Sequence, residues 1–226
     1  MSEKTTILST KTLTSIQKQE LVNAHFSVIE ADFIKTENIS FDLKKINDNL
    51  IFTSQNAVLS ILNHPNIEDL KKKTVFCVGS KTKELLNENG FKVEAHTGYA
   101  EDLAEIISLV YADESYTFFS GNLRKDTLPN ILTENGITFN EIKVYETSLT
   151  SQKIKETVDA ILFFSPSGVT SYLKNNAITN EILFCIGTTT AASLEEKLPE
   201  NKIKNIQVAY QPTIEHVIEE VIEYYS

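Results

Sequence analysis

The chain has 226 residues, of which 41% are hydrophobic and 23% are charged, as in an ordinary globular protein with a substantial core. Its net charge is −10 and Arg124 is its only arginine, which argues against a nucleic-acid partner because phosphate binding needs clustered Lys and Arg. No apolar run approaches the roughly 18 residues that span a bilayer, and the N-terminus lacks the layout of a secretion signal, so we expect a cytoplasmic protein without a membrane partner.

Apolar, β-like runs alternate with helical patterns along the chain. We predict ten strands: 5–9, 27–33, 50–53, 74–78, 91–95, 116–120, 139–145, 160–164, 182–186 and 206–209. Such alternation predicts the α/β class, with parallel sheets covered on both faces. Ten strands are many for one sheet in a chain of this length, so two sheets of about five are expected.

The glycines mark the ends of these elements. Gly90 and Gly136 follow helical patterns and are expected to end them as C-terminal caps. Four others follow strand-like runs, and each is expected just before a helix: Gly79, Gly121, Gly168 and Gly187.

Three segments of the first half recur in the second half in the same order. IFTSQNAVLSIL (51–62) matches LFFSPSGVTSYL (162–173), FCVGSKTKELL (76–86) matches FCIGTTTAASL (184–194), and VEAHTGYAEDLAEII (93–107) loosely matches VAYQPTIEHVIEEVI (208–222). Three ordered matches indicate an internal duplication of one βα architecture.

The first two predicted strands and the extended run 137–149 lie outside the three repeated segments. A run of that length is expected to cross between domains. We therefore predict a discontinuous domain of residues 1–34 and 148–226, an inserted domain of residues 38–143, and linkers at 35–37 and 144–147.

Small hydroxyl and amide residues follow the predicted strands. Ligands bind outside the carboxyl ends of the strands in open parallel sheets, and helix N-termini present N–H groups that suit carboxylates or phosphates. Each residue alone is more simply a helix cap, but together they predict an anion-binding cleft shared by both domains. They are Thr53, Ser54, Asn56, Thr82, Gly121, Asn122, Ser165, Ser167, Gly168, Thr188, Thr189 and Thr190.

Conventional catalytic motifs are absent from the sequence. No loop fits a dinucleotide or Walker fingerprint, no metal-ligand spacing is visible, and Cys77 and Cys185 lie in apolar runs typical of buried, inert thiols. Tyr145, Lys11 and Lys81 are the residues best suited to proton transfer. On these residues alone, a binding protein for a small anion and an enzyme both remain open.

Seven stretches that span nearly the whole chain resemble the uroporphyrinogen-III synthase family in the family's order. They are FTSQNAV (52–58), VGSKTKELL (78–86), SGNLRKDTLPNIL (120–132), VYET (144–147), FFSPSGVTSYL (163–173), IGTTTAASL (186–194) and AYQPTIEHVIEEV (209–221). The resemblance implies two flavodoxin-like domains, the first discontinuous, joined by a two-stranded linker. The sequence departs from the family pattern at Lys11, where an arginine is common, at Lys83, where an alanine is common, and at Thr188, where a proline is common.

The resemblance also implies a reaction. The linear tetrapyrrole hydroxymethylbilane, which carries eight carboxylates, would lose water and close to uroporphyrinogen III with ring D inverted, without a cofactor or metal. Tyr145 becomes the candidate acid, and Lys11 and Arg124 join the hydroxyl-rich turns as candidate contacts for the carboxylates. A monomer is expected. The alternatives are a non-enzymatic binding protein for a small polyanion and a lyase of another polyanionic substrate.

Overall fold

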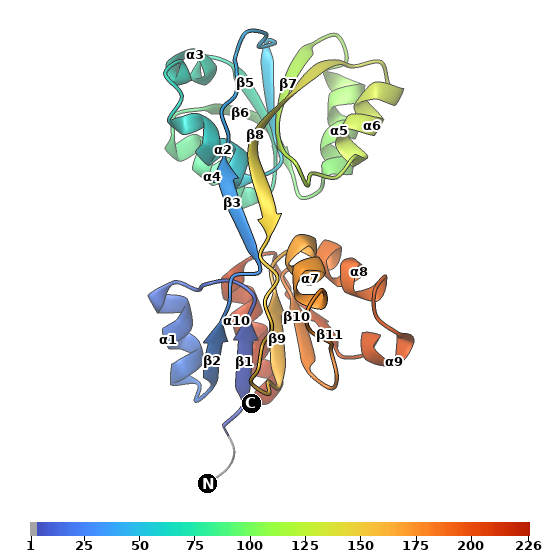
Figure 1. Ribbon diagram of the computed structural model, residues 1–226. Helices are drawn as coiled ribbons and strands as arrows, with labels where there is room; N and C mark the ends of the chain where they lie inside the picture. Colours follow the sequence, from blue (N-terminus) through green and yellow to red (C-terminus); the bar gives the residue numbers. More distant parts are fainter. Residues whose placement is uncertain (1–3) are drawn as a thin grey trace. The chain divides into compact units, whose positions relative to one another are not determined.

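The computed structural model describes residues 4–226, which fold into two compact units (Figure 1). Unit 1 is formed by the chain up to Lys35 together with Ser148–Ser226, and unit 2 is Thr36–Thr147. Each unit is built on its own sheet of mainly parallel strands, which confirms the predicted α/β class with two sheets. The segments predicted as linkers, 35–37 and 144–147, lie within strands in the structure.

Unit 1 has a five-stranded sheet in the order β11-β10-β9-β1-β2, and each pair in it is parallel. Its strands are β1 (Thr6–Ser9), β2 (Ser27–Glu30), β9 (Ala160–Phe163), β10 (Ile182–Cys185) and β11 (Ile206–Val208). Its helices are α1 (Ser15–Asn23), α7 (Pro166–Leu173), α8 (Thr188–Glu195), α9 (Glu200–Ile203) and α10 (Ile214–Tyr225).

Both faces of this sheet are buried, because successive strand residues point to opposite sides. Ile7 and Leu162 pack with the residues of α1 and α10, whereas the neighbouring Leu8 and Ile161 pack with those of α7 and α8. All four side chains are fully buried. Burial on both faces explains why the strands read as continuous apolar runs instead of alternating ones.

Unit 2 has a six-stranded sheet in the order β3-β8-β7-β4-β5-β6. Its strands are β3 (Ile34–Asn38), β4 (Asn49–Phe52), β5 (Thr74–Val78), β6 (Lys92–Thr97), β7 (Ser115–Gly121) and β8 (Thr138–Leu149). Its helices are α2 (Gln55–Leu62), α3 (Ile67–Lys71), α4 (Ser80–Glu88), α5 (Ala100–Val110) and α6 (Thr127–Glu134). The strands from β4 to β8 pair in parallel, with α2 and α4 covering one face and α5 and α6 the other.

The two sheets share one spatial order, but the chain enters that order at different strands. The strand order is β2-β1-β9-β10-β11 in unit 1 and β8-β7-β4-β5-β6 in unit 2. Unit 2 has one further strand, β3, which lies at the edge beside β8. In the sequence repeats, β9, β10 and β11 are equivalent to β4, β5 and β6. The remaining strands β1 and β2 are then equivalent to β7 and β8. The helices agree, because α1 packs on α10 as the equivalent α6 packs on α5. The duplicated units are therefore related by a circular permutation.

Every predicted strand is present, although some of its bounds differ. The second ends at Glu30 instead of residue 33, and β8 extends to Leu149. β3 is an additional strand, in which the four residues after Ile34 are exposed and polar and carry no apolar signal for a strand.

The predicted glycine caps are also confirmed. Gly90 and Gly136 follow α4 and α6 with φ of 83° and 70°, the left-handed region that glycine adopts most readily. The prediction that a glycine stands just before a helix is wrong at two positions. α7 begins at Pro166, whose fixed φ suits the first helical position, so Gly168 lies inside it, and Gly121 is the last residue of β7, whereas α6 begins only at Thr127.

Candidate functional site

The turn between β9 and α7 is shaped by two serines. Ser165 is the N-cap of α7, and its Oγ accepts a hydrogen bond from the Gly168 amide at 3.0 Å. Ser167 Oγ lies 3.1 Å from Ser165 Oγ. A Cβ at the buried Gly168 would lie 3.2 Å from Ser165 Oγ, so glycine allows the first turn of the helix to close tightly on its cap. Two half-buried hydroxyls therefore sit at a helix N-terminus.

The neighbouring turn after β1 is tied to this one. The buried Thr10 donates its Oγ1 proton to the carbonyl of Leu162 on β9 at 2.6 Å. Asp32 accepts from the amide and the hydroxyl of Thr12 at 2.7 and 2.9 Å. Lys11 stands between these anchored residues with its side chain half-buried. Hydrogen bonds of Thr10 and Thr12 therefore fix the loop on both sides of Lys11, the candidate contact in this turn.

α8 begins without a side-chain cap. Its N-cap is Gly187, which has no side chain to accept from the first-turn amides, although its carbonyl accepts from the Thr190 amide at 3.0 Å. Thr188 and Thr189 are exposed in that turn, and Thr190 is buried. α4 of unit 2 is equivalent in the repeat, with Gly79 as an N-cap without a side-chain bond and Thr82 buried in the first turn. First-turn amides that have no side-chain cap, together with the positive end of the helix dipole, suit an anion.

The turn after β4 matches the serine turn of unit 1. Ser54 is the N-cap of α2 and accepts from the Asn56 amide at 3.1 Å. Thr53 and Asn56 are half-buried beside it. Ser54 occupies the position that Ser165 holds in the other repeat, so the two βα turns use the same cap.

Tyr145 lies in the second half of β8, where it pairs with Gly121, the last residue of β7. Its ring covers the α-carbon of Gly121 so closely that a Cβ there would lie 2.3 Å from Tyr145 Cζ. The side-chain amide of Asn122 donates to the Thr147 carbonyl at 3.1 Å and accepts from the Thr147 amide at 2.7 Å. The predicted residues Gly121, Asn122 and Tyr145 are thus brought together.

Arg124 is engaged by two carboxylates. Its Nε and Nη2 donate to the two oxygens of Glu141 at 2.7 and 2.8 Å, and Nη1 donates to Asp126. Ser120 Oγ donates to the same Glu141 at 2.5 Å. The guanidinium holds the pKa of Glu141 below its usual range, and Glu141 in turn raises the pKa of Arg124. The sequence analysis missed Glu141 and Thr147, because their partners lie 17 and 25 residues away and no local pattern signals such pairs.

The predicted site residues thus form one group at the carboxyl edge of each sheet. Unit 1 carries Lys11, Ser165, Ser167, Gly168, Thr188, Thr189 and Thr190, and unit 2 carries Thr53, Ser54, Asn56, Thr82, Gly121, Asn122, Arg124 and Tyr145. That both groups bind one ligand remains a prediction.

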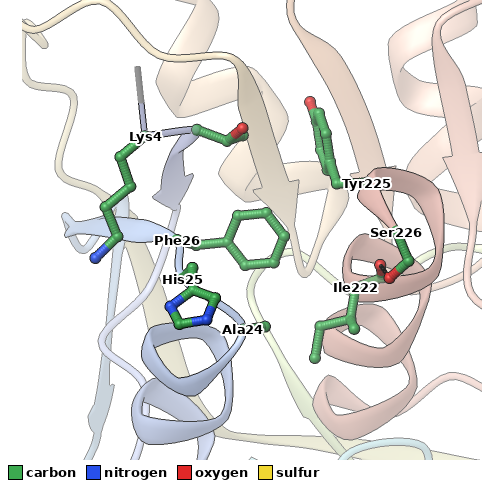
Figure 2. Close-up of a pocket in the computed structure, with 8 residues that line it drawn as sticks. Lys4, Ala24, His25, Phe26, Ile222, Tyr225 and Ser226 are labelled. Atoms are coloured by element: carbon green, nitrogen blue, oxygen red, sulfur yellow. Dashed lines mark hydrogen bonds between the residues drawn. The ribbon is translucent and has the colours of Figure 1, made fainter. Parts of the chain in front are cut away.

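A hollow of about 530 Å³ lies at the opposite edge of the unit 1 sheet (Figure 2). Lys4, His25 and Phe26, which line it, precede β1 and β2, and the ring of Phe26 meets that of Tyr225 edge to face. It contains none of the predicted residues and lies at the amino ends of the strands, whereas open parallel sheets bind ligands at the carboxyl ends. We therefore place the site at the polar turns.

Neither cysteine belongs to these turns. Cys77 and Cys185 are fully buried and unpaired, and burial raises their pKa values to about 11 and about 12, which confirms the prediction of inert thiols. Within residues 4–226 no cluster of His, Cys, Asp and Glu could hold a metal ion. No helix in the described part of the chain is long and apolar enough to cross a membrane.

Comparison with known proteins identifies the family. The family model described as uroporphyrinogen-III synthase HemD matches residues 16–219. This chain belongs to the uroporphyrinogen-III synthase family. A uroporphyrinogen-III synthase from Chlorobaculum parvum is 27% identical in an alignment of 169 residues, which covers 65% of this chain and 69% of that protein.

Solved structures agree on the fold of the family. Uroporphyrinogen-III synthetase from Helicobacter pylori matches with a TM-score of 0.72 and 22% identity, over 98% of this chain and 99% of that one. A mutant uroporphyrinogen III synthase from the extremely thermophilic bacterium Thermus thermophilus matches with a TM-score of 0.66 and 13% identity, over 98% and 100% of the two chains. At these identities the match shows the shared two-sheet fold.

Proposed function

We propose that this chain is a cyclising lyase of tetrapyrrole biosynthesis that converts hydroxymethylbilane to uroporphyrinogen III and water. The observation that carries the proposal is the family match over residues 16–219, which includes every predicted site residue except Lys11. No observation favours the alternative of a non-enzymatic binding protein.

Local donors would bind the substrate. A molecule with eight carboxylates is repelled at long range by a protein of net charge −10, so attraction must come from groups that touch it. The uncapped N-termini of α4 and α8 supply amides beside Thr82 and Thr188–Thr190. The remaining contacts are the side chains or amides of Lys11, Thr53, Ser54, Asn56, Ser165, Ser167 and Gly168.

Arg124 would take part despite its two carboxylate partners. A guanidinium has five N–H donors, and its bonds to Glu141 and Asp126 use three of them. Two donors are left for a substrate carboxylate, but the two nearby acidic groups weaken its attraction. We therefore assign Arg124 a secondary contact.

Tyr145 would be the acid. Its phenol would give a proton to the terminal hydroxyl of hydroxymethylbilane, the C–O bond would break, and the departure of water would give a protonated, cationic azafulvene beside the Tyr145 phenolate. Ring D would then attack through its substituted carbon, pass through a spiro intermediate and end inverted, and the proton released on closure would return to Tyr145. Catalysis otherwise consists of positioning the folded substrate and excluding water. The mechanism uses no cofactor.

The decisive test is the isomer formed from hydroxymethylbilane. Spontaneous closure gives the symmetric type I isomer, so the proposed enzyme gives type III above a protein-free control. Type I alone, at the uncatalysed rate, would reject the proposal in favour of a binding protein. We further propose that the enzyme is a cytoplasmic monomer, and sedimentation analysis of the purified chain would test the monomer.

A further inference from the structure

We propose that Gly121 and Asn122 are positioning residues that hold Tyr145, and that they do not bind substrate. This inference rests on the proposed role of Tyr145 in the cyclisation. Gly121 and Asn122 were predicted to contact substrate carboxylates because they follow a strand, and the inference assigns them a positioning role instead.

Gly121 gives the ring of Tyr145 its place. A Cβ at residue 121 would lie 2.3 Å from Tyr145 Cζ, 2.4 Å from Cε2 and 2.8 Å from the hydroxyl oxygen. Real Cβ atoms do not approach other heavy atoms so closely, so any other residue at 121 displaces the ring. Glycine is needed here for space, not for an unusual backbone angle.

A β-bulge turns Tyr145 toward this place. Ser120 pairs with Lys143, but the next residue, Gly121, pairs with Tyr145, so Val144 is an extra residue in β8. Consecutive residues of a regular strand point to opposite faces. Here Val144 and Tyr145 both pack against the cluster on the α2 and α4 side of the sheet. Without the bulge, Tyr145 would point to the other face.

Asn122 fixes the strand two residues beyond the ring. Its Nδ2 donates to the Thr147 carbonyl at 3.1 Å, and its Oδ1 accepts from the Thr147 amide at 2.7 Å. The side chain thereby satisfies both backbone groups of Thr147, as a neighbouring strand would. The side-chain oxygen of Asn122 and one of its side-chain N–H groups are therefore used in bonds to Thr147, although the residue itself is exposed.

The ring of Tyr145 is thus held by the bulge before it, the Asn122 contact after it and Gly121 beneath it. Its hydroxyl has no hydrogen-bond partner among Thr36–Thr147, the residues of unit 2. A rigidly held ring with an uncommitted phenol suits a proton donor, because misplacement of a reacting group by about 1 Å costs roughly 10²-fold in rate.

The experiment compares Asn122→Ala with Asn47→Ala. Asn47 is a matched control, because its amide bonds the Tyr116 carbonyl at 2.5 Å and Asn140 Oδ1 at 2.8 Å, at the amino ends of the same two strands. For Asn122→Ala we expect kcat to fall about 10-fold or more with KM changed less than about 2-fold, since positioning acts in the transition state. Asn47→Ala should lose stability to a similar degree and keep its kcat.

The same substitution in a Tyr145→Phe background tests the mechanism. Asn122→Ala should add little further loss of kcat there, because residues that act as one unit are not additive. Gly121→Ala should lower kcat in the wild-type background as well. If that variant does not fold, the two asparagine variants still decide.

Three results would overturn the inference. The first is a raised KM with an intact kcat for Asn122→Ala, which would identify a substrate contact. The second is an equal loss of kcat from Asn122→Ala with and without the Tyr145 hydroxyl. The third is a wild-type kcat for Tyr145→Phe, which leaves nothing to position, while type III product from the wild-type chain would still support the proposed function.

Discussion

Replacement of Tyr145 by phenylalanine separates catalysis from packing. The change removes one oxygen and leaves the ring where it covers Gly121. Because the hydroxyl has no hydrogen-bond partner within unit 2, its loss leaves no buried partner there unsatisfied. The free energy of unfolding should therefore change by less than about 0.5 kcal/mol.

The expected effect on the rate is far larger. General acid catalysis contributes about 10²- to 10⁴-fold, which corresponds to about 2.7–5.4 kcal/mol of activation free energy. The assay supplies freshly made hydroxymethylbilane, follows its consumption, and separates the type I and type III products after oxidation. Because uncatalysed closure competes, the slow variant should give more type I isomer than the wild-type chain.

Tyr116→Phe is the matched control in the same unit. The Tyr116 hydroxyl donates to the Tyr111 carbonyl at 2.9 Å, and Tyr116 is fully buried. Its removal should cost about 1–2 kcal/mol of stability and leave kcat unchanged. The reasoning is refuted if Tyr145→Phe retains the wild-type kcat and isomer ratio, or if both variants lose stability equally while neither loses activity.

Three more outcomes are expected. Ser165→Ala should lower the unfolding free energy by about 1 kcal/mol and Ser165→Gly by a few tenths, as measured in urea, and both should raise KM. Glu141→Gln should be less stable than the wild-type chain at neutral pH because it weakens the pair with Arg124. Since the folded state lowers the Glu141 pKa, this difference is fully present above about pH 4.5 and disappears as pH falls through the folded value. Cys77 and Cys185 should react with a thiol reagent only after unfolding, because both are buried.

Each of these outcomes has a clear contradiction. An unchanged KM in both Ser165 variants would remove that hydroxyl from the substrate contacts. A stability difference for Glu141→Gln that persists into strong acid would show that the carboxylate charge is not its cause. Rapid modification of either thiol in the native chain would mean that its strand opens to solvent.

Local patterns were enough to predict the strands, the two-sheet class and the glycine caps. Parallel strands buried on both faces leave continuous apolar runs, and a left-handed cap selects glycine, as at Gly90 and Gly136. Each of these signals lies within a few neighbouring residues. Short polar segments carry no comparable signal, so β3 was predicted as a linker.

The site was predicted only as a set of residue types. The sequence placed Gly121, Asn122 and Arg124 together in one turn with equivalent roles. The structure separates them: Gly121 lies beneath Tyr145, Asn122 bonds Thr147, and Arg124 bonds Glu141. These differences depend on the register of β7 against β8 and on one bulge between them.

From the chain alone we could predict the repeated strand–turn–helix blocks and the polar residues that follow each strand, because each signal lies within a few neighbouring residues. The folded structure was needed to establish the permuted strand order, in which Ile7 of β1 pairs with Ala160 of β9, and the contacts that Tyr145 makes. Strand pairing joins residues that are distant in the chain, and no short stretch of sequence records its partner.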